Sequence, residues 1–219
     1  MYAPRRRARG TLTSLLVLLL ITVSTLAQAP STTAQHDAVI IKGIPSVAQW
    51  YNLSCEYAAA AAVTLYWGNL VSQDDFIREV PQHPNPHIGF RGNIHGPHGW
   101  IGDYGIYAEP LVPVLERRGY TAEVFYGGPD RLKAEINAGH PVVAWITVGR
   151  YIPRPAYWDT YEGKTFKLVP GEHSIVVYGY DSDGIYSMDV ANGGFYHTEW
   201  DSFLTRWNYF GGMALVIYP

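Results

Sequence analysis

The stretch 49-QWYNLSCEYAAAAAVTLYWG-68 contains Cys55, the only cysteine of the chain, shortly before a run of alanines. Alanine has the highest helix propensity, and Asn52 or Ser54 can cap a helix that ends at Gly68. The stretch therefore predicts a helix over residues 55–67 with a thiol in its first turn. Such a thiol is either a small, inert, buried residue or a nucleophile that the helix start helps to ionise.

Length and composition are those of one globular domain. The chain has 219 residues, which allows one substantial core but not two comfortable ones once an N-terminal segment is removed. Hydrophobic residues make up 47% of the chain and charged residues 16%, which argues against disorder over most of it. A lone cysteine cannot form an internal disulfide, so the fold must rely on its core.

Residues 1–29 have the pattern of an export signal. Four arginines precede an apolar run, and small residues follow that run. A cleavage site that ends at Ala29 would be followed by Pro30, which signal peptidases tolerate poorly. Cleavage after Ala27, cleavage after Ala34 and retention as an anchor therefore all stay open. The polar residues 30–38 are predicted to be a linker, and residues 39–219 the folded domain. We therefore expect a secreted or extracellular protein that contacts a membrane only through an uncleaved signal.

Loss of the signal would leave an acidic domain. The signal carries four arginines and no acidic residue, so 12 Lys and Arg would remain against 19 Asp and Glu, and the formal charge would move from −3 to −7. No stripe of Lys and Arg interleaved with aromatic residues is present to offset this charge. We therefore expect no nucleic-acid partner.

The order of predicted elements is helices first and antiparallel strands last. Further helices are expected over 72–80, 107–119, 129–139 and 200–210, and strands over 38–47, 120–127, 141–149, 172–181, 184–190, 194–200 and 212–219. This order indicates an α+β fold in which N-terminal helices pack on a C-terminal antiparallel sheet, with a site in the cleft between the two parts.

Residues 81–105 are too rich in Pro, Gly and His for regular structure and are predicted to be an ordered loop that shapes a substrate groove together with Trp100. The histidines of this loop have spacings that match no ordinary zinc-ligand pattern, and no cysteine accompanies them; they are His83, His87, His95 and His98. We therefore expect no metal and no cofactor.

A catalytic thiol needs more than a helix start. The helix dipole contributes about 0.3 to 1 kcal/mol, or up to about 2 kcal/mol when partly buried, which is about one pKa unit. Lasting ionisation requires a nearby cation, and an imidazolium is the usual one. His173 heads an apolar strand, Asp189 ends the next and could orient the imidazole, and the amide of Gln49 could bind an oxyanion together with the backbone N–H of Cys55. Each of these three residues could instead have only a structural role, for example as a histidine packed in the core or an aspartate that binds the backbone of a turn.

Several motifs resemble the C39-like cysteine peptidases, which have the papain-like fold. The resemblance covers most of residues 40–218 and rests on QWYNLSCEY (49–57), GWIGDYGIYAEPL (99–111), AGHPVVAWITV (138–148), GEHSIVVYGYD (171–181) and SMDVANGGFYHTEWDSF (187–203). It implies that Cys55 is the nucleophile, His173 the general base and acid, Asp189 the orienting residue and Gln49 the oxyanion donor.

The chain departs from the pattern of this family in two places. Bacteriocin-processing members commonly have Gly after the cysteine, whereas Glu56 is more similar to the stand-alone exported branch. That branch usually has Asp-Pro where this chain has Asp189-Val190, which leaves Asn192 as an alternative orienting residue.

The sequence therefore predicts an exported cysteine hydrolase, a monomer, that cleaves peptide or related amide bonds of a peptide or protein substrate through a thioester acyl-enzyme. Two alternatives stay open. The same site could transfer the acyl group to an amine, or a catalytically silent papain-like domain could bind peptide or a cell-surface polymer.

Overall fold

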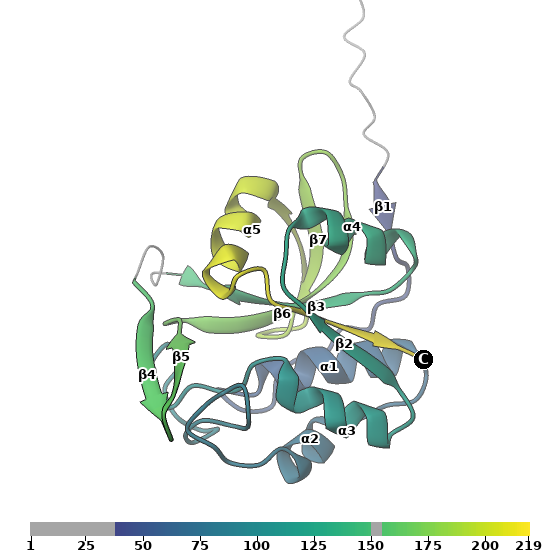
Figure 1. Ribbon diagram of the computed structural model, residues 1–219. Coiled ribbons are helices and arrows are strands. Elements are labelled where there is room, and N and C mark those ends of the chain that lie inside the picture. Colours follow the sequence, from purple (N-terminus) through teal and green to yellow (C-terminus); the bar gives the residue numbers. More distant parts are fainter. Residues whose placement is uncertain (1–37, 150–154) are drawn as a thin grey trace, which may run out of the picture. The chain divides into compact units, whose positions relative to one another are not determined.

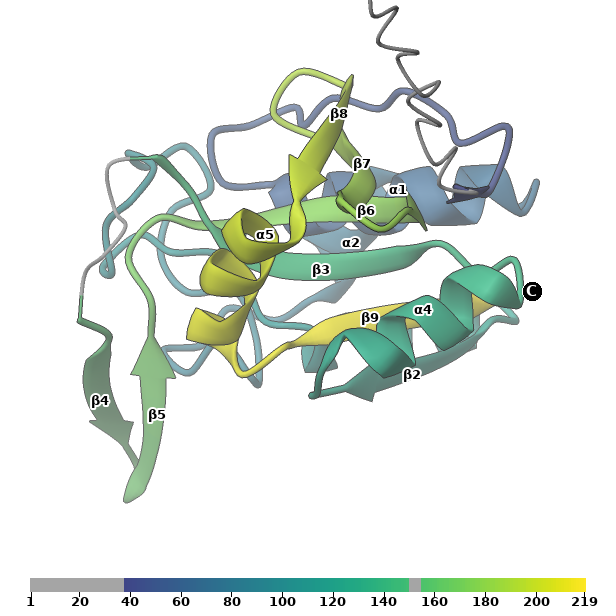
Figure 2. The same cartoon turned by 90° about the horizontal axis from the view of Figure 1, so that it is seen from above.

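The computed structural model describes residues 38–149 and 155–219, and the predictions for the signal and for nearly all of the linker lie outside these ranges. Its main feature is a seven-stranded antiparallel sheet with the order β2-β9-β3-β6-β7-β8, in which β1 pairs with β6 (Figures 1 and 2). The strands are β1 (Val39–Ile40), β2 (Thr121–Phe125), β3 (Val142–Thr147), β6 (Glu172–Tyr180), β7 (Gly184–Asp189), β8 (Gly194–Glu199) and β9 (Ala214–Tyr218).

Helices cover both faces of this sheet, as Figure 1 shows. One face packs against α1 (Cys55–Tyr66) and α3 (Val112–Arg117), with α2 (Gln73–Glu79) packed on α1, and the other face packs against α4 (Pro129–Asn137) and α5 (Trp200–Trp207). The predicted α+β class is therefore confirmed, with a second layer of helices on the far face. None of the helices in the described ranges is both long enough and apolar enough to cross a membrane.

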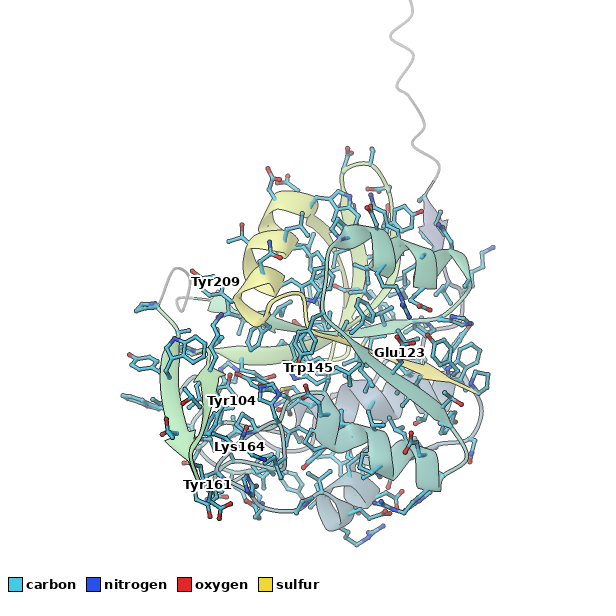
Figure 3. All side chains as sticks on the ribbon, viewed as in Figure 1. Tyr104, Glu123, Trp145, Tyr161, Lys164 and Tyr209 are labelled. Carbon is cyan, nitrogen blue, oxygen red and sulfur yellow. The ribbon has the colours of Figure 1, made fainter. Side chains whose placement is uncertain are left out.

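Strand alternation divides the core into two parts. On β3, Val143 and Trp145 face the α1 side, whereas Val142, Ala144 and Ile146 face α4 and α5. The indole of Trp145, labelled in Figure 3, is fully buried and donates a hydrogen bond to a loop carbonyl. Each face of the sheet thus has its own hydrophobic layer.

The alanines of α1 explain how a helix fits against this sheet. Residues 55–64 are all buried, so this part of α1 is covered on every side rather than along one stripe. Ala58, Ala59 and Ala60 are fully inaccessible. Their methyl groups let the helix axis come close to β6, and this close approach brings the start of α1 to the start of β6.

One hairpin was not predicted from the sequence. Strands β4 (Tyr157–Tyr161) and β5 (Lys164–Leu168) pair as a separate two-stranded sheet that projects beside the main sheet (Figure 2). Tyr161 and Lys164 flank its tip (Figure 3), and the two turn residues, Glu162 and Gly163, both have positive φ. Two-residue hairpin loops favour such conformations, but Asn-Gly or Asp-Gly is the usual signal, and Glu-Gly gave none.

Two other predicted elements are shorter than expected. The helix predicted over 107–119 is a 3-10 turn (Glu109–Leu111) followed by the six residues of α3, with a proline in the first turn of each. The strand predicted over 38–47 keeps two residues, because Gly43 has a positive φ and Pro45 cannot donate a ladder hydrogen bond. Another 3-10 turn (Asn208–Phe210) follows α5.

Candidate active site

The predicted site residues come from four segments that meet at one end of the sheet. Cys55 begins α1, His173 is the second residue of β6, Asp189 is the last residue of β7, and Gln49 lies on the segment that enters α1. In the ladder between β6 and β7, Ile175 is opposite Asp189. His173 lies two residues before Ile175 on the same face, so its ring can reach the Asp189 carboxylate.

His173 and Asp189 form a close pair. The Nε2 atom of His173 lies 2.6 Å from Oδ1 of Asp189. The imidazole is almost entirely buried and the carboxylate is partly exposed. Burial opposes ionisation of Asp189, but the hydrogen bond with His173, the charge of that ring and the backbone N–H of Ala191 together outweigh this effect and hold the pKa of the carboxyl below its usual range. The same oxygen accepts a hydrogen bond from the backbone N–H of Ala191, which fixes its position.

Asn192, the alternative orienting residue, serves the turn between β7 and β8. Its Oδ1 accepts a hydrogen bond from the backbone of Gly194, and its amide donates to the hydroxyl of Tyr196. The side-chain contact of His173 is therefore made by Asp189.

A cleft of about 700 Å³ opens over this pair. One wall carries His173, Asp189, Val148 and Ala191, and the facing segment is 49–52, with His98 also lining the cleft. The backbone N–H of Gln49 donates to the carbonyl of Val190 at 2.7 Å, so the segment that enters α1 is joined to the residue that follows Asp189. Trp100 is highly exposed and does not line this cleft; from the 81–105 loop, His98 does.

Gln49 lies in the cleft, but its amide serves local backbone groups. Its Nε2 donates to the carbonyls of Tyr51 and Asn52 at 2.7 and 2.9 Å. These bonds fix the segment that leads into α1. Both amide hydrogens are therefore engaged, and an oxyanion would have to displace one of these carbonyls.

The Cys55 thiol faces two carboxyl groups. It is 2% exposed. Its Sγ lies 3.3 Å from Oε2 of Glu56 and 3.9 Å from Oε2 of Glu172. Within the described ranges His173 is not one of its hydrogen-bond partners. The structure thus pairs His173 with Asp189 and places Gln49 in the same cleft, whereas the thiol of Cys55 faces the two glutamate carboxyl groups.

These two glutamates are the site residues that sequence reasoning missed. Glu56 was noted only as a departure from a family pattern, and Glu172 was not singled out. Both are immediate neighbours of a predicted catalytic residue. Glu172 and Ser174 share the face of β6 that packs on α1, because they alternate with His173 along the strand. That alternation is the signal that could have found Glu172.

Burial reverses the expected ionisation of the thiol. Desolvation is the largest effect, the charges of Glu172 and Glu56 add to it, and together they raise the pKa of Cys55 well above its usual value. Burial also raises the pKa of Glu56 to about 7 and that of Glu172 above its usual range. In this conformation the net shift of the Cys55 pKa is therefore opposite in direction to the contribution expected from the helix start.

The histidines of the 81–105 loop have separate partners. His87 Nδ1 lies 3.0 Å from a carboxylate oxygen of Glu109, and the His95 ring packs edge-on against Tyr51. His98 Nε2 lies 2.9 Å from the backbone carbonyl of Glu172, and burial lowers the pKa of this histidine. His98 therefore lines the cleft with a ring that is held by the backbone of Glu172.

Comparison with known proteins identifies the family. The family model described as "Peptidase_C39 like family" matches residues 41–215. The chain belongs to this C39-like family. A curated relative of this C39-like chain is the uncharacterized protein YvpB of Bacillus subtilis (strain 168), which is 26% identical over 179 residues that cover 76% of this chain and 69% of YvpB.

Solved structures share the fold of this C39-like chain. A candidate C39-like peptidase from Bacillus anthracis aligns with a TM-score of 0.71 and 22% identity, over 84% of this chain and 98% of its own. The peptidase domain of Streptococcus ComA, a bi-functional ABC transporter, aligns with a TM-score of 0.54 and 15% identity, over 81% and 99%. The predicted family and papain-like fold are both confirmed.

Proposed function

We propose that this C39-like protein is a cysteine peptidase that hydrolyses peptide or related amide bonds. The observation that carries the proposal is the His173–Asp189 pair, 2.6 Å apart in a cleft whose facing segment leads into the helix that begins with Cys55. In this proposal Cys55 is the nucleophile, His173 the base and acid, and Asp189 the orienting residue.

The tautomer of His173 supports its role as a base. Asp189 is ionised and can only accept, so Nε2 of His173 carries the proton and Nδ1 has a free electron pair. Nδ1 is thus available to take the thiol proton. Asp189 then stabilises the imidazolium that forms. For this transfer the thiol has to turn from the carboxyl pair toward the ring.

The covalent steps follow from these positions. The thiolate attacks the scissile carbonyl carbon, and the resulting oxyanion is bound by the backbone N–H of Cys55, which has no intrahelical partner at the helix start. Collapse breaks the C–N bond, and His173 gives its proton to the departing amine. A water molecule then loses a proton to His173 and attacks the thioester, which releases the acid and restores the thiol. Gln49 contributes a second donor if it releases one of its carbonyl partners.

A peptide-library cleavage assay tests this proposal. Wild-type protein should yield new amino termini, Cys55→Ala should yield none, and His173→Ala should reduce the rate by about 10² to 10⁴. An inert surface change, Glu116→Gln, is the control. Stoichiometric peptide binding without cleavage would instead support the binding alternative, and amide products formed only with an added amine would support acyl transfer. Cleavage that survives in Cys55→Ala would contradict the role of the thiol.

We also propose that residues 1–29 direct export. The support is the order of basic, apolar and small residues in the sequence. Expression of the full chain in a bacterial host, followed by amino-terminal sequencing of protein recovered from the medium, distinguishes the possible cleavage positions. Protein that stays in the cytoplasm with its amino terminus intact would contradict export.

A further inference from the structure

Three acidic groups gather at the buried end of α1. Within the described ranges, one group of three potential metal ligands is present, the Sγ of Cys55 and one carboxylate oxygen each of Glu56 and Glu172, and these atoms all lie within 4.8 Å of one another. All three side chains are buried. Full ionisation would place three negative charges in a site of low dielectric, which is prohibitively costly unless protons or a cation neutralise them.

The spacing of these atoms fits a tetrahedral zinc site. Zinc binds thiolate sulfur at about 2.3 Å and carboxylate oxygen at about 2.0 to 2.2 Å, so a tetrahedral angle separates sulfur from oxygen by about 3.5 Å. The observed separations of Cys55 Sγ from the two carboxylate oxygens are 3.3 and 3.9 Å. Both sulfur–oxygen separations are thus within a few tenths of an ångström of the zinc value, and the third separation, between the two carboxylate oxygens, is at most 4.8 Å.

An orphaned oxygen points independently to a ligand. In the part of the chain that the structure describes, Oε1 of Glu172 is buried and makes no hydrogen bond, and the same is true of Oγ of Ser174. Both belong to the face of β6 that packs on α1. Buried polar atoms without partners are rare in folded proteins, and a bound water or ion often satisfies them. One of the two unpartnered atoms belongs to Glu172, whose other carboxylate oxygen lies 3.9 Å from the Cys55 sulfur.

The backbone holds Glu56 in the orientation that a metal site requires. Its Oε1 accepts a hydrogen bond from the backbone N–H of Ile106 at 2.7 Å, which leaves Oε2 directed at the thiol. Gly105 makes this possible, because a Cβ at that position would lie 2.2 Å from Oε1 of Glu56. The carboxylate is therefore positioned by the fold before any ligand arrives.

We propose that Cys55, Glu56 and Glu172 bind one divalent cation, with Zn²⁺ as the best match, and that this cation withdraws the thiol from His173. As the sulfur–metal bond forms, the thiol proton leaves to solvent, together with any proton shared by the carboxyl pair. The sulfur electron pair is then engaged by the metal and cannot attack a carbonyl. Binding of the metal stands apart from the proposed peptidase activity, and only its inhibitory effect on cleavage depends on that activity.

Cobalt provides a direct test. The metal-stripped full chain is titrated with Co²⁺, and the near-ultraviolet thiolate-to-cobalt charge-transfer absorption is followed, with Zn²⁺ added afterwards as a competitor. We expect one equivalent of Co²⁺ to give this absorption and Zn²⁺ to remove it. Cys55→Ser should abolish the absorption. Glu172→Gln and Glu56→Gln should each weaken binding by at least about tenfold, whereas Glu116→Gln, an exposed control, should not.

His173→Ala separates this site from a cysteine–histidine site. In our proposal this variant keeps the absorption, and loss of the absorption there but not in Glu172→Gln would overturn the ligand set. Absence of saturable absorption in the wild-type chain would overturn the site itself. Thermal unfolding of each variant without metal shows that it is folded. Zn²⁺ should also slow alkylation of Cys55 by iodoacetamide by at least about tenfold, and an unchanged alkylation rate would overturn the withdrawal of the thiol.

Discussion

Substitution of Gly105 by alanine should destabilise the fold through the Glu56 carboxylate. Gly105 has a φ of 115°, in a region that residues with a Cβ rarely adopt. The added Cβ would lie 2.2 Å from Oε1 of Glu56 and 3.5 Å from Oε2 of Glu172. The first contact is impossible, so either the Glu56 carboxylate or the backbone around residue 105 must move.

The cost has two parts that a control can separate. The unfavourable φ costs about 1 to 3 kcal/mol. Displacement of the carboxylate leaves the buried N–H of Ile106 without its acceptor, which costs about 1 to 3 kcal/mol more. We therefore expect Gly105→Ala to lower the free energy of unfolding by about 4 kcal/mol. Gly119 has a φ of 88° and no heavy atom within 4 Å of its virtual Cβ, so Gly119→Ala should show only the backbone part.

Urea unfolding of the two variants, followed by tryptophan fluorescence, gives both free energies. A typical domain has about 5 to 15 kcal/mol of stability, so both variants should be folded enough to measure. Gly105→Ala should be the less stable by about 2 kcal/mol. Equal losses in the two variants would show that Glu56 does not occupy the space beside Gly105, and the arrangement of the acidic site would then be wrong.

Three further results are expected. Tyr104→Phe should lower the free energy of unfolding by about 1 to 3 kcal/mol, because the buried hydroxyl accepts the N–H of Val169 at 3.0 Å; urea unfolding measures this. Asp75→Asn should lower the free energy of unfolding by about 1 kcal/mol at pH 7, because hydrogen bonds from the N-cap serine hold the pKa of Asp75 below its usual range. This contribution is present above about pH 4 and is lost as the pH falls. The free energies of unfolding of the wild type and the variant, measured against pH, should therefore converge in acid. Asp189→Ala should lower kcat/KM for peptide cleavage about a hundredfold or more, whereas Asn192→Ala should change it less than tenfold; the reverse order would contradict the orienting role of Asp189.

Much of the fold was predictable because long periodic segments dominate it. The helix that begins at Cys55 and the strands around 142–147 and 172–180 were expected close to their observed bounds. The hairpin of β4 and β5 was not, because its strands carry exposed aromatic residues and its turn, Glu162-Gly163, lacks the usual signal. Local rules fail where tertiary contacts or an uncommon turn residue decide the conformation.

The candidate site was predictable in its parts but not in its electrostatics. The register of two neighbouring strands brings His173 to Asp189, and strand ends in the sequence suggested this pairing. The direction of the pKa shift of Cys55 could not be predicted from the sequence in the same way. A helix start stabilises a thiolate by up to about 2 kcal/mol, whereas burial of an unpaired charge costs several kcal/mol, and burial is a property of the whole fold. The larger effect determines the sign of the pKa shift.

The two possible partners of the thiol arise from the geometry of adjacent residues. On a helix the neighbour of Cys55 is turned by about 100°, and on a strand the neighbour of His173 points to the opposite face. Where the start of α1 meets the start of β6, each predicted catalytic residue therefore has a glutamate beside it in the sequence: Glu56 follows Cys55, and Glu172 precedes His173. The ring of His173 is close enough to Glu56 to act on the pKa of that carboxyl, although burial has the larger effect. The thiol therefore has two candidate partners, the imidazole for the proposed catalysis and the carboxyl pair for the proposed metal binding. For this reason His173→Ala and Glu172→Gln should act in opposite ways: the first should slow peptide cleavage by about 10² to 10⁴ and keep metal binding, and the second should weaken metal binding while the base remains in place.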